Sequence, residues 1–359
     1  MIFAPVCIPT LNRVEHLSKC VESLKKSNQA ARTELVLGVD YPANDSHIKG
    51  WLDMRKYVKT IDGFGKVTIF FRKENVGIHE NYRLLREYAF ENYDRMIFTE
   101  DDNVFSPCFL EFMNEMLEKF KDDPEVWGIC PFFQSEYIDL EGYTSNVAKI
   151  KGYYCDYGSG AWRDKYEERR NSIVVPYQKY VCNLGGRLDV FKKYLSLFYL
   201  FLRIKDIYPD LQGPCDIAYG ISSILNNKYY IVPIKPIVKN IGYDGTGTYC
   251  GEMKDDPYSR RPISDDSNYE IVMNADFELM KDEISESHSE ERGWREDSRG
   301  EFLDTYNRKK MPRLINCYKK YGYYFGEFAR KEIRNGRLFH FFMRHSPRAL
   351  INFVKKMFP

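Results

Sequence analysis

Short apolar runs alternate with amphipathic segments along the first hundred residues of the chain. The runs typical of buried strands cover residues 2–8, 35–39, 66–71 and 96–98. The first run is expected to end at Pro9. Residues with helical spacing between the runs include Val14, Leu17, Val21 and Leu24, and further helices are expected over about 46–60 and 79–90. This alternation predicts an α/β fold with a mostly parallel sheet and helices on both of its faces.

Polar side chains follow each of the four predicted strands. They are Thr10, Asn12 and Arg13 after the first strand, Asp40 after the second, Arg72 and then Asn75 after the third, and Glu100, Asp101 and Asp102 after the fourth. Because parallel strands end at the same edge of a sheet, we expect these side chains to converge on one crevice. An arginine suited to phosphate and an acid suited to a nucleobase or ribose indicate a site for a nucleoside diphosphate.

Three adjacent carboxylates, Glu100, Asp101 and Asp102, would repel one another unless a cation lay among them. Mg²⁺ or Mn²⁺ bound by one or two carboxylates and by diphosphate oxygens would supply that cation. The alternative is a solvated acidic turn, followed by a helix with Ser106 at its N-cap and Pro107 in its first turn.

Composition restricts the class of protein. The 359 residues are 43% hydrophobic, which is enough for a core that serves two subdomains or one domain with an extension. A net charge of +1 argues against nucleic-acid binding. The nine cysteines include no C-x-x-C pair, so we expect reduced thiols in a cytoplasmic protein. We expect no signal peptide, and no apolar run approaches the ~18–20 residues of a membrane-spanning helix.

The later part of the chain changes character twice. An apolar helix is expected over residues 188–203, whereas residues 253–305 are rich in charged and serine residues and read as a variable extension. From about Arg334, basic residues are interleaved with Phe, Leu and Ile. This amphipathic pattern suits peripheral binding to an anionic membrane, and a helix packed on the catalytic domain is the equal alternative.

Three N-terminal segments have a distinctive sequence, namely APVCIPTLNR, ENVGIHENYRLL and MIFTEDDNVFSPCFLEFM. They resemble segments of inverting glycosyltransferases of family 2, which have the GT-A fold. The EDD motif also resembles that of N-acetylglucosaminyltransferase I. Later segments, YGSGAWRDKY, GPCDIAYG and VKNIGYDGTGTYC, resemble the acceptor segment, the catalytic-base segment and the closing loop of bacterial sugar transferases. The resemblance covers residues 1 to about 250.

The resemblance implies a role for each candidate residue. Donor contacts are expected from Thr10, Asn12, Arg13, Asp40, Arg72, Asn75, Glu100 and Asp101, metal ligation from Asp102, general-base catalysis from Asp216, and acceptor contacts from Gly160, Trp162 and Asp244. It also implies a donor half over residues 1–105, an acceptor and catalytic half over 106–250, and a helical C-terminal extension over 251–359.

Alternatives remain for the acceptor side. Asp216 could instead be the N-cap of a helix, with Asp156, Asp164 and Asp244 as rival bases, and Trp162 could be a plain core residue. Relatives often carry a histidine where this chain has Tyr249, which weakens any second protein ligand for the metal there.

The sequence as a whole indicates a metal-dependent, inverting glycosyltransferase that uses Mn²⁺ or Mg²⁺. We expect a UDP-sugar donor, a glycan or lipid-linked acceptor in bacterial surface-polysaccharide synthesis, and a cytoplasmic protein in peripheral contact with the inner face of the membrane. A sugar-phosphate nucleotidyltransferase is one alternative, although CIPTLNR lacks the glycine-rich loop expected of that class. A non-catalytic, membrane-associated protein with a GT-A-like fold is another.

Overall fold

The computed structural model describes residues 2–133, 144–150, 154–176, 219–220, 222–223, 226–247, 262–264 and 269–273 of the chain. Several expectations lie outside these residues. They are the helix over 188–203, the candidate base Asp216, the residue Tyr249, and the tail from Arg334 with most of the predicted C-terminal extension.

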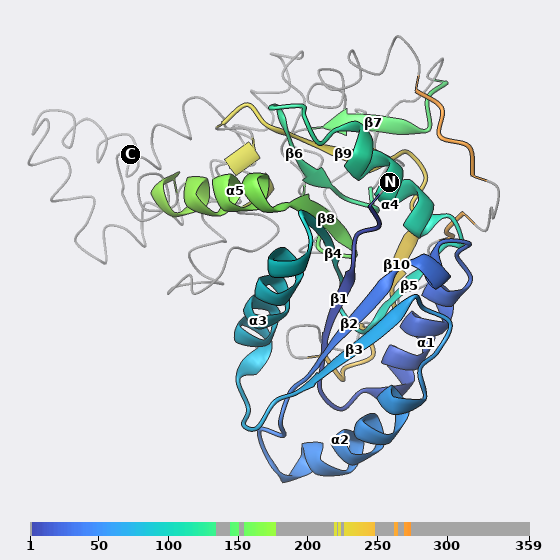
Figure 1. The fold of residues 1–359 in the computed structure, drawn as a ribbon, viewed down its shortest axis with the longest axis vertical. Coiled ribbons are helices and arrows are strands. Elements are labelled where there is room, and N and C mark those ends of the chain that lie inside the picture. The colour runs from blue at the N-terminus through green and yellow to red at the C-terminus, as the bar shows by residue number, and fades with distance from the viewer. Residues whose placement is uncertain are drawn as a thin grey trace, which may run out of the picture.

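The described strands form one large sheet and one small one (Figure 1). The large sheet has eight strands in the order β3-β2-β1-β4-β8-β6-β9-β7, and the small sheet pairs β10 with β5. The strands are β1 (Val6–Thr10), β2 (Glu34–Val39), β3 (Lys66–Phe71), β4 (Arg95–Phe98), β5 (Asn103–Phe105), β6 (Val126–Ile129), β7 (Val147–Ile150), β8 (Ser159–Trp162), β9 (Tyr229–Pro233) and β10 (Val238–Asn240).

The large sheet is mostly parallel. Strands β1 to β4 are parallel to one another, β8 is antiparallel to both β4 and β6, and β9 is parallel to β6 but antiparallel to β7. Six of its strands therefore run in one direction, and β7 and β8 run in the other. Because β8 lies between β4 and β6, the sheet combines strands from both predicted halves of the chain.

Five α-helices and two short 3₁₀ helices have bounds within the described part of the chain, and residues 219–220 and 222–223 are also helical. The helices with bounds are α1 (Val14–Lys25), η1 (Ala30–Arg32), α2 (Asp45–Tyr57), η2 (Val58–Thr60), α3 (Gly77–Asn92), α4 (Phe109–Lys119) and α5 (Arg163–Pro176). None of the helices described here combines the length and apolar character needed to cross a membrane.

Helices cover both faces of the sheet because successive residues of a strand point to opposite sides. Val6 and Ile8 of β1 belong to a core that includes residues of α1 and α4, whereas Cys7 packs in a second core with Leu85 of α3. Figure 1 shows α1 and α2 on one side of β1–β3 and α3 on the other. The predicted α/β class, with a mostly parallel Rossmann-like sheet and helices on both faces, is confirmed. This arrangement is consistent with the GT-A layout.

The first strand is shifted from its predicted position. It begins at Val6 and continues through Pro9, so the expectation that Pro9 would end it is wrong. The Cys7 carbonyl accepts from the Thr99 N–H on the β4 side, and Pro9 faces that same side two residues later. Because β4 pairs only with Val6 and Cys7, the missing N–H of Pro9 leaves no ladder bond unmade.

The acidic turn after β4 also differs in detail from its alternative interpretation. The helix that follows, α4, begins at Phe109 with Cys108 at its N-cap, two residues later than capping by Ser106 would place it. Ser106 Oγ instead accepts a long bond of 3.4 Å from the Cys108 N–H. The turn itself leads directly into β5, whose pairing with β10 begins at Asn103 opposite Asn240.

Candidate functional site

The first four strands of the sheet end together, at an edge that we call the carboxyl edge. The Asp40 N–H donates to the Thr10 carbonyl at 2.9 Å, and the Arg72 N–H donates to the Val39 carbonyl at 2.9 Å. On the other side of β1, the Thr99 N–H donates to the Cys7 carbonyl at 3.1 Å. The predicted residues that follow these strands are thus linked through the backbone at one edge of the sheet.

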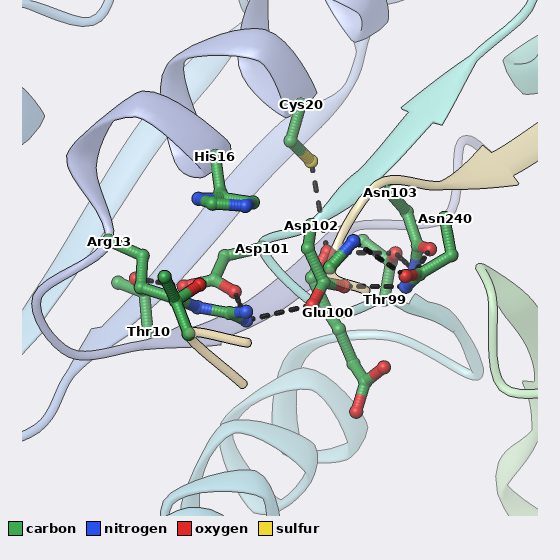
Figure 2. Close-up of polar contacts among 12 residues, drawn as sticks. Thr10, Arg13, His16, Cys20, Thr99, Glu100, Asp101, Asp102, Asn103 and Asn240 are labelled. Carbon is green, nitrogen blue, oxygen red and sulfur yellow. Dashed lines mark hydrogen bonds and ion pairs between the residues drawn. The ribbon is translucent and has the colours of Figure 1, made fainter. Parts of the chain in front are cut away.

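Asp101 and Asp102, the acidic pair, contact Arg13 (Figure 2). The Nη2 atom of Arg13 contacts Asp101 Oδ1 and also lies 2.9 Å from Asp102 Oδ2. Thr10 Oγ1 donates to the second oxygen of Asp101, Oδ2, at 2.7 Å. Thr10 comes from the end of β1 and Arg13 from the N-cap of α1, so the first strand and helix together hold the acidic turn.

Asn240, the last residue of β10, binds the other side of the acidic pair. Its Nδ2 donates to Asp102 Oδ1 at 2.7 Å and to Asn103 Oδ1 at 3.0 Å. Its Oδ1 accepts from the Gly242 N–H at 2.8 Å, and the Ile241 N–H donates to the Asp102 carbonyl at 2.8 Å. The small β5–β10 sheet thereby fixes the backbone and the side chain of Asp102.

Gly242 lies against the carboxylate of Asp102. A Cβ on this residue would overlap Asp102 Oδ2 and would lie 2.7 Å from Asp102 Cγ. Only a residue without a side chain lets the backbone approach this closely to the carboxylate oxygen that is paired with Arg13.

Burial has the largest effect on the charge of Asp101. Asp101 is 4% exposed and Asp102 is 7% exposed. Burial and the neighbouring Asp102 carboxylate raise the pKa of Asp101, although Arg13 and the Thr10 hydroxyl act in the opposite direction. Burial also opposes the charge of Arg13, but the two carboxylates outweigh it and raise the pKa of the guanidinium. One arginine thus carries the countercharge for two carboxylates.

Asp40, Asn75 and Arg72 lie at the neighbouring strand ends. Asp40 accepts from the Val76 N–H at 3.0 Å and from the Gly77 N–H at 2.9 Å, and Asn75 Nδ2 donates to the Tyr41 carbonyl at 2.6 Å. These bonds fix the start of α3 beside the end of β2.

Arg72, which follows β3, has a partly unpaired guanidinium near Asp40. Its Nε donates to Asn81 Oδ1 at 3.0 Å, but its buried Nη2 has no hydrogen-bond partner in the part of the chain that is described. Burial lowers the pKa of Arg72, against the nearby carboxylates of Asp40 and Glu80. A buried guanidinium nitrogen without a partner is costly, and an anionic ligand would relieve that cost.

Asp244 lies on the α1 side of the acidic pair. It follows β10, and its Oδ2 is 3.1 Å from His16 Nε2 on α1, while its Oδ1 accepts from the N–H and the hydroxyl of Thr246. Partial burial would raise the pKa of Asp244, but the bonds from Thr246 and the nearby His16 lower it. The loop after β10 is thus attached to α1 next to the candidate site.

Two other predicted donor residues are less closely involved. The Glu100 side chain points away from the acidic pair (Figure 2), and its backbone carbonyl accepts a long contact of 3.9 Å from the buried Cys20 thiol. Asn12 lies in the turn between β1 and α1, where its backbone closely approaches Gly50 of α2. Neither side chain joins the hydrogen bonds around Asp101 and Asp102 that are described above.

The structure does not bring Trp162 and Gly160 to the acidic pair as acceptor residues. Trp162 pairs with Arg95 at the beginning of β4, whereas the acidic pair follows the end of that strand. Its side chain is buried, and its indole N–H donates to the Leu117 carbonyl at 2.9 Å. Trp162 is therefore a core residue, the alternative left open by the sequence. Gly160 lies inside β8, where a Cβ would be 2.8 Å from Met113 Cε, so close packing accounts for the glycine.

The three alternative bases, Asp156, Asp164 and Asp244, differ in which end of the strands they lie near. Asp156 precedes β8, whose first residue, Ser159, pairs with Phe98 at the end of β4. Asp156 accepts from the Tyr154 hydroxyl and from Ser159 Oγ at 3.2 Å. Asp164 follows Trp162 at the opposite end of β8. Asp156 and Asp244 are therefore on the side of the acidic pair, and Asp164 is not.

The acidic pair fits a divalent ion only as a site with one or two carboxylates. No group of three His, Cys, Asp or Glu side chains suited to a metal occurs among the described residues. The two adjacent, buried carboxylates supply the hard oxygen donors that Mg²⁺ and Mn²⁺ take, and only one protein cation of the described part of the chain, Arg13, now balances their charge. Asp102, with Asp101 beside it, would hold such an ion together with ligand oxygens.

Sequence reasoning missed several residues that build the site. They are His16, Asn81, Asn103, Asn240 and Gly242. Asn240 and Gly242 lie in the segment VKNIGYDGTGTYC. The sequence predicted a closing loop there, but it did not predict the contacts of these two residues with Asp102. Side-chain pairing between residues 137 or more positions apart leaves no local pattern in a single sequence.

Comparison with known proteins gives distant structural likenesses. No family model matches the chain, and no curated protein matches it. The chain is similar to S. aureus TarS 1–349 in complex with UDP-GlcNAc, with 14% identity over 42% of this chain and 34% of that one, and a TM-score of 0.28. It is also similar to the mannosyltransferase PcManGT from Pyrobaculum calidifontis in complex with GDP-Man and Mn²⁺, with 11% identity over 62% of this chain and 68% of that one, and a TM-score of 0.38.

A further structure of S. aureus TarS 1–349 matches with 13% identity over 64% of this chain and 57% of that one, and a TM-score of 0.37. The first match thus spans about a third of the TarS chain. PcManGT is a mannosyltransferase, and TarS was crystallised with UDP-GlcNAc. All three likenesses are distant, with TM-scores between 0.28 and 0.38.

Proposed function

We propose that this protein is a nucleotide-sugar-dependent glycosyltransferase of the GT-A type. The observation that carries the proposal is the pair of arginines at the carboxyl edge. Arg13 and Arg72 each have a buried guanidinium nitrogen without a partner among the described residues. Arg13 contacts the buried Asp101 and Asp102, and Arg72 lies near Asp40 at the end of the neighbouring strand. An anion that brings its own cation, such as a nucleoside diphosphate with a divalent ion, satisfies both sets of groups at once.

The donor would bind across the ends of β1 to β4. Asp40 and Asp101 are suited to accept bonds from a nucleobase or ribose, and Arg13 and Arg72 are suited to bind phosphate oxygens. Thr10 orients Asp101, and Asn240 orients Asp102. We assign Asp102 as the main metal ligand from the family resemblance, and its support is that Asn240 holds its carboxylate in a fixed, buried position. A bound Mn²⁺ or Mg²⁺ would neutralise the negative charge that develops on the departing diphosphate.

The acceptor hydroxyl needs a base, because it is a weak nucleophile until a positioned carboxylate takes its proton. We propose Asp216 for this role from the family resemblance. Attack from the face opposite the leaving group would invert the anomeric carbon. Asp156 and Asp244 are the alternatives that the geometry supports, since both lie on the side of the acidic pair.

The finer assignments rest on the resemblance and on sequence pattern. They are a UDP-sugar donor, a glycan or lipid-linked acceptor, a place in bacterial surface-polysaccharide synthesis, and peripheral binding of the basic tail to the cytoplasmic face of the membrane. Co-sedimentation with liposomes tests the tail. Binding that ignores anionic lipid and salt would favour a tail packed on the domain.

The function is tested by a screen of nucleotide sugars for hydrolysis or transfer, with Mn²⁺, with Mg²⁺ and with EDTA. We expect one UDP-sugar to be consumed only when the metal is present, and the released sugar or product to have inverted configuration. Full activity in EDTA would overturn the metal dependence. Turnover of a sugar phosphate with a nucleoside triphosphate would favour the nucleotidyltransferase alternative, and binding of UDP without any turnover would favour the non-catalytic one.

The base is tested by comparing Asp216→Asn, Asp156→Asn and Asp244→Asn. Asparagine keeps the shape of the side chain and removes its basicity, so loss of the base should lower kcat by about 10²–10⁴ with donor affinity nearly unchanged. We expect that result for Asp216→Asn alone. Normal turnover by this variant, with a large loss in either of the others, would move the role to that residue.

A further inference from the structure

Arg13 makes an unusual contact with the acidic pair. A single guanidinium nitrogen, Nη2, contacts both Asp101 Oδ1 and Asp102 Oδ2, while the buried Nη1 has no hydrogen-bond partner among the described residues. An arginine paired for structural strength commonly uses two nitrogens in parallel against one carboxylate. This arginine therefore neutralises two acids with one donor and keeps another donor unused.

Each of the four carboxylate oxygens of the acidic pair has a donor. Asp101 is bound by Thr10 and Arg13, and Asp102 is bound by Asn240 and Arg13. A divalent ion and a guanidinium cannot occupy the same place beside Asp102 Oδ2, because their positive charges repel and both need that oxygen. Of the two donors on Asp102, Arg13 is the one that can withdraw, since Asn240 is held by Asn103 and Gly242.

The side chain of Arg13 is also the more accessible of these groups. It is 20% exposed, compared with 6% for Asp101 and 10% for Asp102. A diphosphate offers oxygens arranged for two parallel guanidinium bonds, so it would engage the unused Nη1 together with Nη2. Binding of a diphosphate would thus draw Arg13 away from Asp102 and leave that carboxylate for a metal ion.

We propose that Arg13 is an exchangeable counter-ion that excludes the divalent ion from Asp102 until a diphosphate draws the guanidinium away. The inference rests on the proposed function for the identity of the diphosphate, but the exclusion itself concerns only this chain and the metal. It makes metal binding conditional on nucleotide binding. By thermodynamic reciprocity, the metal then strengthens nucleotide binding by the same factor.

The exclusion is tested with the full chain and Mn²⁺ alone, by following free Mn²⁺ with electron paramagnetic resonance. We expect weak binding by the native protein and binding at least tenfold tighter by Arg13→Gln, which removes the competing charge. Asp102→Asn added to Arg13→Gln should abolish the gain. Lys25→Gln is the matched control, because it removes one positive charge from the same helix, from a residue whose ion pairs are with Glu22 and Asp62. Equal or weaker Mn²⁺ binding by Arg13→Gln would overturn the proposal.

Folding of the variant is checked in the same experiment. Two unneutralised carboxylates should lower the melting temperature of Arg13→Gln, and Mn²⁺ should raise it by more than it raises that of the native protein. Arg13→Lys keeps a positive charge without the planar fork, so its Mn²⁺ affinity should fall between those of the other two proteins. If Arg13→Gln fails to fold, an Mn²⁺ affinity of Arg13→Lys no tighter than native would overturn the proposal.

Addition of UDP separates this inference from the proposed function. UDP should tighten Mn²⁺ binding by the native protein at least tenfold and by Arg13→Gln several times less. If UDP changes nothing in the native protein while Arg13→Gln still gains affinity for Mn²⁺, the exclusion by Arg13 stands and the nucleotide-sugar function fails. If UDP tightens Mn²⁺ binding equally in both proteins, the release of Arg13 by diphosphate is wrong.

Discussion

Carboxylates are buried at both ends of the parallel strands, but the groups that balance their charge differ between the two ends. At the carboxyl edge, Asp101 and Asp102 share one arginine, and burial with like charge raises the pKa of Asp101. At the amino edge, where the same strands begin, Glu34 is the first residue of β2 and is also buried. Its charge is met by several donors rather than by a competing acid.

Glu34 receives bonds from four side chains. The hydroxyls of Thr68, Tyr88 and Tyr93 donate to its two oxygens, and Lys66 Nζ lies 2.9 Å from Oε1. Burial alone would raise the pKa of Glu34, but the bonds from these side chains lower it to about 2. These contacts hold the beginnings of β2 and β3 to the segment before β4.

The difference supports the proposal that the acidic pair binds a ligand, whereas Glu34 stabilises the fold. A carboxylate with four donors stabilises the folded chain, because unfolding removes bonds that favour its charged form. Two adjacent carboxylates with one shared cation stabilise it little, since their mutual repulsion offsets what Arg13 provides. Sites that bind charged ligands commonly retain such unbalanced groups.

The largest effect is expected at the carboxyl edge, from Asp102→Asn. The variant keeps the shape of the side chain but loses the charge, so metal-dependent turnover should fall at least about 10³-fold. The free energy of unfolding should fall by about 1 kcal/mol, because the amide turns a donor toward Arg13 or Asn240 while the repulsion from Asp101 is relieved. Activity assays and urea unfolding measure the two effects. An Asp102→Asn enzyme with native activity would show that the carboxyl edge does not bind the catalytic metal.

A smaller loss of activity is expected from Gly242→Ala. The added Cβ would overlap Asp102 Oδ2, so the carboxylate must move away from the place where it meets Arg13 or a metal. A displacement of about 1 Å in a catalytic group can cost about 100-fold in turnover, and we expect a loss of that order. Metal-dependent nucleotide binding should weaken in parallel. Gly160→Ala provides the contrast, because it should lower stability through the contact with Met113 without this specific loss of metal response.

At the amino edge, Glu34→Gln should lower stability and leave turnover unchanged. Glutamine loses the charge of the carboxylate, and its amide N–H₂ would face hydroxyl or ammonium donors instead of accepting from them. This change should lower the free energy of unfolding by about 2 kcal/mol. Urea unfolding of the native protein and the variant at neutral pH measures the cost. A Glu34→Gln protein of native stability but reduced turnover would reverse the roles that we assign to the two edges.

The pH dependence of stability gives the same residue a second test. The folded-state pKa of Glu34 lies below its ordinary value of 4.5, so its contribution to stability is complete above about pH 4.5 and is lost as pH falls toward about 2. The difference in unfolding free energy between the native protein and Glu34→Gln should therefore shrink over that interval. A difference that stays constant down to pH 2 would contradict the lowered pKa.

The sequence predicted the parallel half of the sheet well because its strands are continuous apolar runs. The bounds of β3 were predicted in full, and those of β2 and β4 to within one residue. The expectation that residues after parallel strands meet at one edge of the sheet was also correct for Thr10, Arg13, Asp101 and Asp102, which contact one another. Pro9 was misjudged because its lost N–H matters only where a neighbouring strand pairs, and the pairing of β4 ends at Cys7.

The contacts made by β10 and β8 could not be predicted from local pattern. Asn240 binds Asp102 across 138 positions, and Trp162 lies at the opposite end of β4 because β8 is antiparallel to it. Strand direction decides which end of a segment reaches the site, and a motif read along the chain carries no information about direction. Asp216 stays a prediction, since it lies outside the described residues.

The smallest effect is expected from Trp162→Phe, which tests this reading of β8. Leu117 is in the last turn of α4, where backbone carbonyls have no partner within the helix, and the Trp162 indole N–H binds its carbonyl at 2.9 Å. Phenylalanine keeps most of the apolar volume and removes that bond, so the cost should be about 1 kcal/mol of unfolding free energy. Turnover and the KM for the acceptor should stay within about twofold of native, because Trp162 is buried and pairs with the beginning of β4, whereas Asp101 follows its end. A large rise in the acceptor KM at unchanged stability would instead return Trp162 to the acceptor site.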